Sequence, residues 1–309
     1  MRIYLLPLFI LICWGCQRVP DTLEPKLNYA VQDKYFLSLP SPFPPLSGSD
    51  RALDVGKEMQ VGLGFAHELD LYQAITAFKR AEFLCPPQET ALLMQAQYEV
   101  LLCYYMGKKW DGVIETFERG QLRFADSSFP AFHDLLLILY DTYKQTGKDF
   151  QAEKIFELIQ YTNKEEAAHL QLSNALILAN IPALKGVSTP SIESLVASYE
   201  ARKKGVATAQ TLNALLPGAG YLYLGQTQSA LTAFFLNGLF IAASVYFFET
   251  GNVAAGAIFT SFEAGWYFGG IYGAGLEAKT YNERLYESLA TPLMNKEKLF
   301  PALMLNYAF

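Results

Sequence analysis

"LLPGAGYLYLGQ", residues 215–226, sets a proline, closely spaced glycines and two tyrosines among leucines. Glycines at such spacing either cradle a phosphate in a loop or interrupt a helix. A nucleotide loop needs a preceding strand and a following Lys-Ser/Thr pair or acidic residue, and this stretch has neither. We therefore predict a tight turn at the headgroup level of a membrane, built from Pro217, Gly218, Gly220, Tyr221, Tyr223 and Gly225.

Two apolar segments follow this turn. No charged side chain occurs between Lys204 and Glu249, and residues 229–248 are a 20-residue run, long enough to cross a bilayer as a helix. After the polar break "ETGN", residues 253–276 are apolar again apart from Glu263. The pattern predicts a hydrophobic helical hairpin. Small residues at every fourth position of its second helix favour close helix contact in lipid: Ala257, Ser261, Gly265, Gly269 and Gly273.

Glu263 needs an explanation, because a carboxylate inside a membrane helix is costly and often functional. Pairing with Asn237, or with Tyr267 one turn on, would make it a proton-carrying or recognition group. The pattern favours the alternative, a protonated packing residue or one near a wet surface. We predict no catalytic residue, metal site or cofactor, because neither metal spacing nor an adjacent nucleophile accompanies the histidines, which are His67, His133 and His169.

The turn and the two apolar segments, with "IYGAGLEAKTYN" after them, resemble a small bacterial module over about residues 208–285. That module pairs a "PGxGxxYxG" turn with two hydrophobic helices. It occurs in cell-envelope proteins, sometimes in company with membrane-protein insertion factors. The resemblance implies a place in the envelope and says nothing about chemistry.

A repeat with a period of 39 residues precedes these segments. Each unit has one aromatic residue on a first helix and three further residues at steps of 9, 4 and 3. The last two steps place side chains on one helical face. The three units are Phe65, Ala74, Phe78 and Ala81; Tyr104, Val113, Phe117 and Gly120; and Tyr143, Ala152, Phe156 and Ile159. Stacked helix pairs are predicted, with an unrelated antiparallel helical bundle as the alternative.

These positions resemble the tetratricopeptide repeat over roughly residues 55–165. Gly62, Pro86 and Gly147 fill further consensus places. The period of 39 departs from the family's repeat of about 34 residues, as do Gly120 and Ile159 at the fourth position. The resemblance implies a concave surface that binds a peptide or protein partner.

The N-terminus indicates export. Residues 3–15 form an uncharged apolar run, too short to span a bilayer but typical of a signal-peptide core. Gly15-Cys16 resembles the end of a bacterial lipobox, which implies cleavage before Cys16 and lipidation of that cysteine. Cys13 and Trp14 depart from the lipobox pattern, and an ordinary signal peptide is the alternative. The prolines within residues 17–50 predict an extended linker.

Local signals predict further helices. Asn163 with Glu166 indicates an N-cap and capping box for a helix over 164–180. Thr189-Pro190 begins a helix that runs to residue 204 and on towards residue 216.

Cys85 and Cys103 are predicted to be free thiols, because they fall at different heights of antiparallel neighbours. The alternating apolar residues that lead to Phe309 resemble the last strand of outer-membrane barrel proteins. Pro301 interrupts them, and a short strand or a tail docked on a partner is favoured.

Composition and charge place the chain at a membrane. Hydrophobic residues make up 51% and charged residues 17%, and the net charge of −6 argues against nucleic acid as a partner. Cations flank the hairpin at residues 202–204, 279 and 284, and by the positive-inside rule they would place its flanks in the cytoplasm. The cleaved export signal places the repeats in the periplasm, and it takes precedence because the linker and lipobox agree with it.

We therefore expect a mainly α protein with a tetratricopeptide-like solenoid and a hydrophobic helical hairpin. Its expected parts are a signal peptide (1–16), a proline-rich linker (17–50), helical repeats (51–204), a membrane-associated hairpin module (205–290) and a tail (291–309). The expected function is a non-enzymatic envelope lipoprotein that binds a protein partner at a membrane, with membrane-protein assembly as one setting. The alternative is a small intramembrane transport or enzymatic device centred on Glu263, with the repeats as a regulatory cap. The oligomeric state and the choice of inner or outer membrane stay open.

Overall fold

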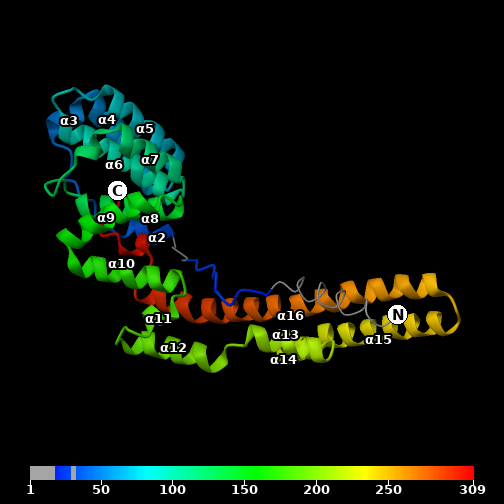
Figure 1. Ribbon diagram of the computed structural model, residues 1–309. Coiled ribbons are helices and arrows are strands. Elements are labelled where there is room, and N and C mark those ends of the chain that lie inside the picture. The colour runs from blue at the N-terminus through cyan, green and yellow to red at the C-terminus, as the bar shows by residue number, and fades with distance from the viewer. Residues whose placement is uncertain (1–17, 29–32) are drawn as a thin grey trace. The chain divides into compact units, whose positions relative to one another are not determined.

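The computed structural model describes residues 18–28 and 33–309 (Figure 1). The predicted signal peptide and the predicted lipidation site, Cys16, lie outside these residues. The described chain is α-helical without a strand, and it divides into two compact units. The hairpin unit contains residues 18–27 and 175–292, and the stacked-helix unit contains residues 28, 33–174 and 293–309.

The stacked-helix unit is built from consecutive helices that pack on their neighbours in the chain. Helix α4 contacts α5, α5 contacts α6, α6 contacts α7, and α8 contacts α9. The elements, in chain order, are α2 (Asp33–Leu37), α3 (Gly48–Ala52), α4 (Asp54–His67), α5 (Leu71–Leu84), α6 (Thr90–Met106), α7 (Trp110–Arg119), η1 (Gln121–Phe124), α8 (Phe132–Gln145), α9 (Asp149–Thr162) and α10 (Lys164–Ile177), with α17 (Pro301–Met304) near the end of the chain.

One turn geometry joins three of these helix pairs at a spacing of 39 residues. Its left-handed residues are Leu69 (φ 60°), Lys108 (φ 53°) and Gly147 (φ 69°). The next residue in each turn donates its N–H to a carbonyl oxygen five residues back, Asp70 to Phe65 at 2.9 Å, Lys109 to Tyr104 at 2.8 Å and Lys148 to Tyr143 at 2.9 Å. This bond satisfies a carbonyl at the end of the first helix. The sequence period therefore corresponds to a repeated helix–turn–helix geometry.

The repeated residues lie in or against one hydrophobic core. Six of the ten predicted packing residues are buried: Ala74, Phe78, Ala81, Val113, Tyr143 and Ala152. The other four are half-buried against the same core: Phe65, Tyr104, Phe117 and Phe156. Gly62 lies directly under the ring of Phe78, where a Cβ would overlap it.

Residues 33–50 differ from the extended linker that their prolines predict. Phe36 is buried, and the ring of Phe43 packs edge-on against Tyr98, with ring centroids 5.7 Å apart. Ser47 and Asp50 form a capping box at the start of α3. Aromatic burial outweighs the extended preference of the prolines, because each large ring removes apolar surface from water.

The C-terminal tail packs into the stacked-helix unit of its own chain, in place of the strand or partner-docked tail predicted for it. Leu305, Ala308 and Phe309 belong to the same hydrophobic core as the repeats. The hydroxyl of Tyr35 donates to the carbonyl of Leu303 at 2.8 Å. Pro301 begins the short helix α17, which interrupts the alternating pattern before any strand can form.

The hairpin unit contains α11 (Ile181–Leu184), α12 (Pro190–Arg202), α13 (Val206–Leu215), α14 (Ala219–Tyr223), α15 (Thr227–Glu249) and most of α16 (Val253–Lys296). Helices α15 and α16 form the hairpin drawn in yellow and orange in Figure 1. Helix α16 is 44 residues long and continues well beyond the apolar part predicted for it.

The helix predicted from residue 190 towards residue 216 is broken into α12 and α13. At the break, Lys204 donates its N–H to Asn282 Oδ1 at 2.7 Å, and its carbonyl accepts from Asn282 Nδ2 at 2.7 Å. The side chain of Asn282 thus supplies both hydrogen bonds that a helix interior would supply, so the break leaves Lys204 satisfied.

Candidate functional site: a glycine-rich turn and a hydrophobic hairpin

The glycine-rich turn is held by close packing of backbone on backbone. Gly218 adopts φ 95° and donates its N–H to Asn213 Oδ1 at 2.9 Å. A Cβ at Gly218 would overlap the carbonyl oxygen of Ala230, and one at Gly220 would overlap that of Ala209. Any larger residue would therefore push apart the helices that meet at this turn.

The tyrosines of the turn lie against neighbouring segments. The hydroxyl of Tyr223 accepts from the N–H of Gly205 at 3.1 Å, and the ammonium of Lys204 lies 4.6 Å from the centre of the Tyr223 ring. The hydroxyl of Tyr221 covers Gly273 on α16, where a Cβ would press against it. Gly225 ends α14 with φ 81°, which allows the chain to turn into α15.

In the hairpin, polar side chains are buried and large apolar side chains are exposed, which is the reverse of the distribution in soluble proteins. The buried positions of α15 include Asn237 and Ser244, which are polar. Many of its large apolar side chains are exposed: Leu231, Phe234, Phe235, Leu239, Ile241, Val245, Tyr246 and Phe248. Helix α16 adds Val253, Ile258, Phe262 and Trp266 to this exposed apolar surface. In water such a surface would be strongly unfavourable, whereas lipid favours it.

Helix α15 is the one helix of the described chain that is long and apolar enough to cross a membrane. It is 23 residues long, its most apolar 18-residue stretch has a mean hydropathy of 1.8, and 6% of that stretch is buried. The apolar part of α16, the second helix of the predicted hairpin, does not reach the same hydropathy because Glu263 and several glycines interrupt it.

The predicted small-residue face of α16 is not the contact between the hairpin helices. Ala257, Ser261, Gly265 and Gly269 are exposed. A stripe at every fourth residue drifts about 40° per step around a helix of 3.6 residues per turn, so it cannot follow one straight partner. The helices instead meet through aromatic rings, with Phe247 stacked on Phe259 at 5.2 Å.

The structure does not pair Glu263 with either predicted partner. The amide of Asn237 donates to the carbonyl of Ala233 at 2.5 Å, and the hydroxyl of Tyr267 donates to the carbonyl of Ala214 at 2.5 Å. Among the described residues, Glu263 Oε2 and Asn237 Oδ1 each have no hydrogen-bond partner.

A groove of about 650 Å³ runs along the hairpin between α15 and α16. We call it the hairpin groove; its residues on α15 are Gln228, Ser229, Thr232, Ala233 and Asn237, its residues on α16 are Gly265, Trp266, Gly269, Gly270 and Glu277, and Tyr221 and Gln226 complete it. A Cβ at Gly265 or Gly269 would meet no described atom within 4 Å. These glycines therefore leave open a space that larger side chains would occupy.

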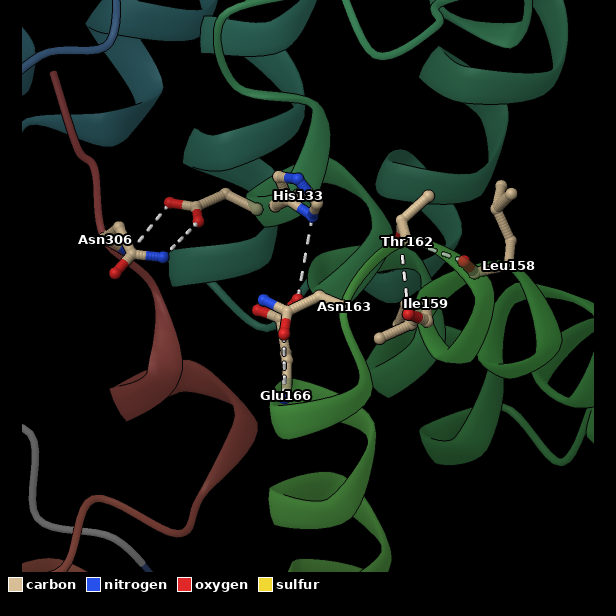
Figure 2. Close-up of polar contacts among 8 residues, drawn as sticks. His133, Leu158, Ile159, Thr162, Asn163, Glu166 and Asn306 are labelled. Carbon is tan, nitrogen blue, oxygen red and sulfur yellow. Dashed lines mark hydrogen bonds and ion pairs between the residues drawn. The ribbon is translucent and has the colours of Figure 1, made fainter.

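The stacked-helix unit contains buried or half-buried carboxyl groups, and of these only Glu166 was predicted to have a role, as part of a capping box. Asp134 Oδ2 accepts from the N–H groups of Asn306 at 2.9 Å and Tyr307 at 2.8 Å. Burial, which outweighs these bonds, raises the pKa of Asp134 to about 6. The bonds anchor the C-terminal tail, which Figure 2 shows at Asn306.

Glu166 lies near His133, with 3.7 Å between Glu166 Oε2 and His133 Nδ1 (Figure 2). Its backbone N–H donates to Asn163 Oδ1 at 3.2 Å, which is the predicted N-cap of α10. Burial, with the charge of Asp134 nearby, raises the pKa of Glu166 to about 7. The carboxyl of Glu166 thus faces His133, and no bond from it to the cap residue is seen among the described atoms.

Glu99 is the most deeply buried of these carboxyl groups, with 0% of its surface exposed. Neither carboxylate oxygen has a partner among the described residues, and burial raises its pKa to about 8. A charged residue inside the apolar run "YEVLLCYY" was the signal that could have revealed it.

Cys85 and Cys103 are free thiols, as predicted. Within the described residues, no group of histidines, cysteines and carboxylates is arranged to hold a metal ion. Comparison with protein-family models, curated proteins and solved structures finds no match to this chain. Function is therefore inferred from the residues and their geometry.

Proposed function

We propose that this protein is a membrane-anchored, non-enzymatic scaffold of the bacterial cell envelope. In this proposal the hairpin inserts in a membrane, and tetratricopeptide-like repeats in the stacked-helix unit bind a protein partner. A lipid on Cys16 provides a second anchor. The assembly of membrane proteins is one process that such a scaffold serves.

The exposed apolar surface of α15 is the observation that carries this proposal. A core helix of a soluble protein would be mostly buried, whereas little of α15 is. A signal sequence would lie near the N-terminus, whereas α15 begins at Thr227. Insertion in lipid removes the cost of exposing this surface, because each buried Å² of apolar area contributes roughly 25 cal/mol.

A groove in the stacked-helix unit offers a surface for the partner. It has a volume of about 550 Å³, and its apolar lining includes Leu71, Ile75 and Trp110 beside the exposed ring of Tyr72. Lys108, Lys109 and Asp111 also line it. An apolar groove with charges of both signs at its edge suits a peptide with apolar anchors and polar neighbours.

Membrane extraction of two forms of the protein tests the anchors separately. Labelled palmitate should enter the wild type and not the Cys16→Ser variant. Carbonate or urea washing should leave Cys16→Ser in the membrane, because the hairpin holds it there. Release of that variant into the soluble fraction would contradict hairpin insertion, and equal palmitate labelling would contradict lipidation.

The unpartnered Oε2 of Glu263 supports a second candidate, an intramembrane transport or enzymatic device. This candidate predicts that Glu263→Gln abolishes function while abundance and partner binding stay normal. The scaffold predicts the opposite sensitivity, to substitutions such as Trp110→Ala and Tyr72→Ala in the groove of the stacked-helix unit. A cellular assay of envelope integrity with both sets of variants separates the two.

A further inference from the structure

The hairpin groove contains a hydrogen-bond acceptor deep in an apolar surface. Asn237 is 3% exposed, and its amide nitrogen is already engaged with the carbonyl of Ala233. Asn237 lines the groove, and its buried Oδ1 has no partner among the described residues. An unpaired polar atom in a medium without water is costly, so a donor from outside the hairpin would stabilise it.

The depth of Asn237 restricts what can supply that donor. It lies ten residues after Thr227 on α15, roughly 15 Å along the helix axis at 1.5 Å per residue. The hydrocarbon core of a bilayer is about 30 Å thick, so an inserted hairpin holds Asn237 near its middle. Lipid headgroups lie at the interface, out of reach of that position.

The charges of the groove also argue against a phospholipid phosphate. Among the described residues, no lysine, arginine or histidine lines it. Glu277, the one carboxylate among these described lining residues, accepts a hydrogen bond from Gln226 at 2.7 Å. The other polar lining residues, Gln228, Ser229 and Thr232, are neutral. Such a lining suits a neutral ligand with hydroxyl or amide groups.

The shape of the groove favours a helix as the ligand. At Gly265 and Gly269 its α16 side carries no side chain, which allows another backbone to approach closely there. Ala257 and Ser261 continue this small-residue surface along the exposed side of α16. In lipid, where no hydrophobic force joins helices, such surfaces and buried hydrogen bonds hold helices together.

We infer that the hairpin groove binds a transmembrane helix of another membrane protein, one that carries a hydroxyl or amide side chain near its middle. That side chain donates to Asn237 Oδ1, and the helix backbone lies against Gly265 and Gly269. This inference rests on the proposed function, because it requires the hairpin to be inserted.

A photo-crosslinking experiment with the full-length protein in lipid nanodiscs tests the inference. A benzophenone amino acid replaces Gln228 in the groove or, as a control, Leu231, which lies outside it and is exposed. The probe is a biotinylated 20-residue leucine–alanine helix with lysines at both ends and either asparagine or leucine at its centre. Capture should occur from position 228, with roughly a threefold to tenfold preference for the central asparagine.

Three variants test the contributions of individual hairpin residues to probe capture. Each is made in the chain that carries the crosslinker at position 228. Asn237→Leu should remove the preference between the two probes. Gly269→Leu fills the groove and should lower capture of both probes at least tenfold. Gly238→Leu is the matched control, because Gly238 is an exposed glycine outside the groove with no described atom near its Cβ position. It should leave capture unchanged.

Equal capture of the two probes by the wild type, or unchanged capture by Gly269→Leu, would overturn the inference. Crosslinks only to lipid, or only to a second copy of the chain, would overturn it as well. Gly265→Leu provides an independent way to fill the groove if Gly269→Leu fails to accumulate. Carbonate washing of the same preparations distinguishes hairpin insertion from helix binding in the groove. A chain that resists washing but captures no probe contradicts helix binding and leaves hairpin insertion standing.

Discussion

Replacing Glu99 with glutamine measures what a buried carboxyl costs the stacked-helix unit. Glu99 lies on α6 with no exposed surface, and its oxygens have no partner among the described residues. Burial raises its pKa from 4.5 to about 8. Glutamine has nearly the same shape and cannot ionise, so the pH-dependent part of the difference between the two proteins reports the carboxyl group alone.

The sign of the effect follows from the direction of the pKa shift. The folded state binds the proton of Glu99 more tightly than the unfolded state, so its contribution to stability rises as the pH falls from about 8 towards 4.5. At pH 7 the unfolded carboxyl is ionised and the folded one is mostly protonated. From pH 4.5, the pKa of the unfolded carboxyl, to pH 7, the free energy of unfolding falls by about 1.36 kcal/mol per pH unit. Over these about 2.5 pH units the loss is about 3 kcal/mol. Glu99→Gln avoids this cost at pH 7, and little of it exists at pH 4.5.

Hydrogen exchange of the α6 amides, corrected for the intrinsic effect of pH, provides the assay. The ratio of exchange rates between wild type and Glu99→Gln should grow on the order of a hundredfold from pH 4.5 to pH 7, with the variant the slower. Glu157→Gln, at an exposed position on α9, serves as the control and should show no such growth. A ratio for Glu99→Gln that is independent of pH would refute the reasoning.

Two further substitutions test the turn and the tail. Gly218→Ala places a Cβ in a left-handed residue and against the Ala230 carbonyl, so we expect a loss of at least 2 kcal/mol, seen as faster proteolysis of the hairpin in nanodiscs. Gly238→Ala, in an exposed part of α15, should be neutral or slightly stabilising, and equal loss in both would contradict the packing described here. Asp134→Ala removes the acceptor of two backbone N–H groups, at about 1–3 kcal/mol each, and should speed chymotrypsin cleavage after Tyr307. Unchanged cleavage would show that the tail is held by apolar packing alone.

The sequence contained enough information for the repeat helices and their turns. The 39-residue period placed Phe65, Tyr104 and Tyr143 one turn before equivalent left-handed residues, because the same local bonds close each helix. Asn163 was recognisable as an N-cap because its side chain bonds a backbone group only three residues away. Local chemistry of this kind needs no knowledge of distant residues.

The sequence did not indicate in the same way which helix faces pack against each other. Helix α15 is apolar almost all round, so its pattern does not indicate which side meets α16, and the small-residue stripe was assigned to the wrong side. The docking of Phe43 and Phe309 on the core depends on residues far away in the chain. Glu99 was hidden because a charged residue is expected to lie at the surface.

The burial of the tail bears on the order in which the protein can be made. Residues 301–309 complete the core of the stacked-helix unit, yet they follow the hairpin in the chain. During synthesis, α4 to α9 emerge first and must wait with an open apolar surface until the hairpin has also been translated. Chaperones therefore have a defined interval in which to bind them. A chain that stalls within the hairpin would keep that surface exposed and would be a substrate for proteases.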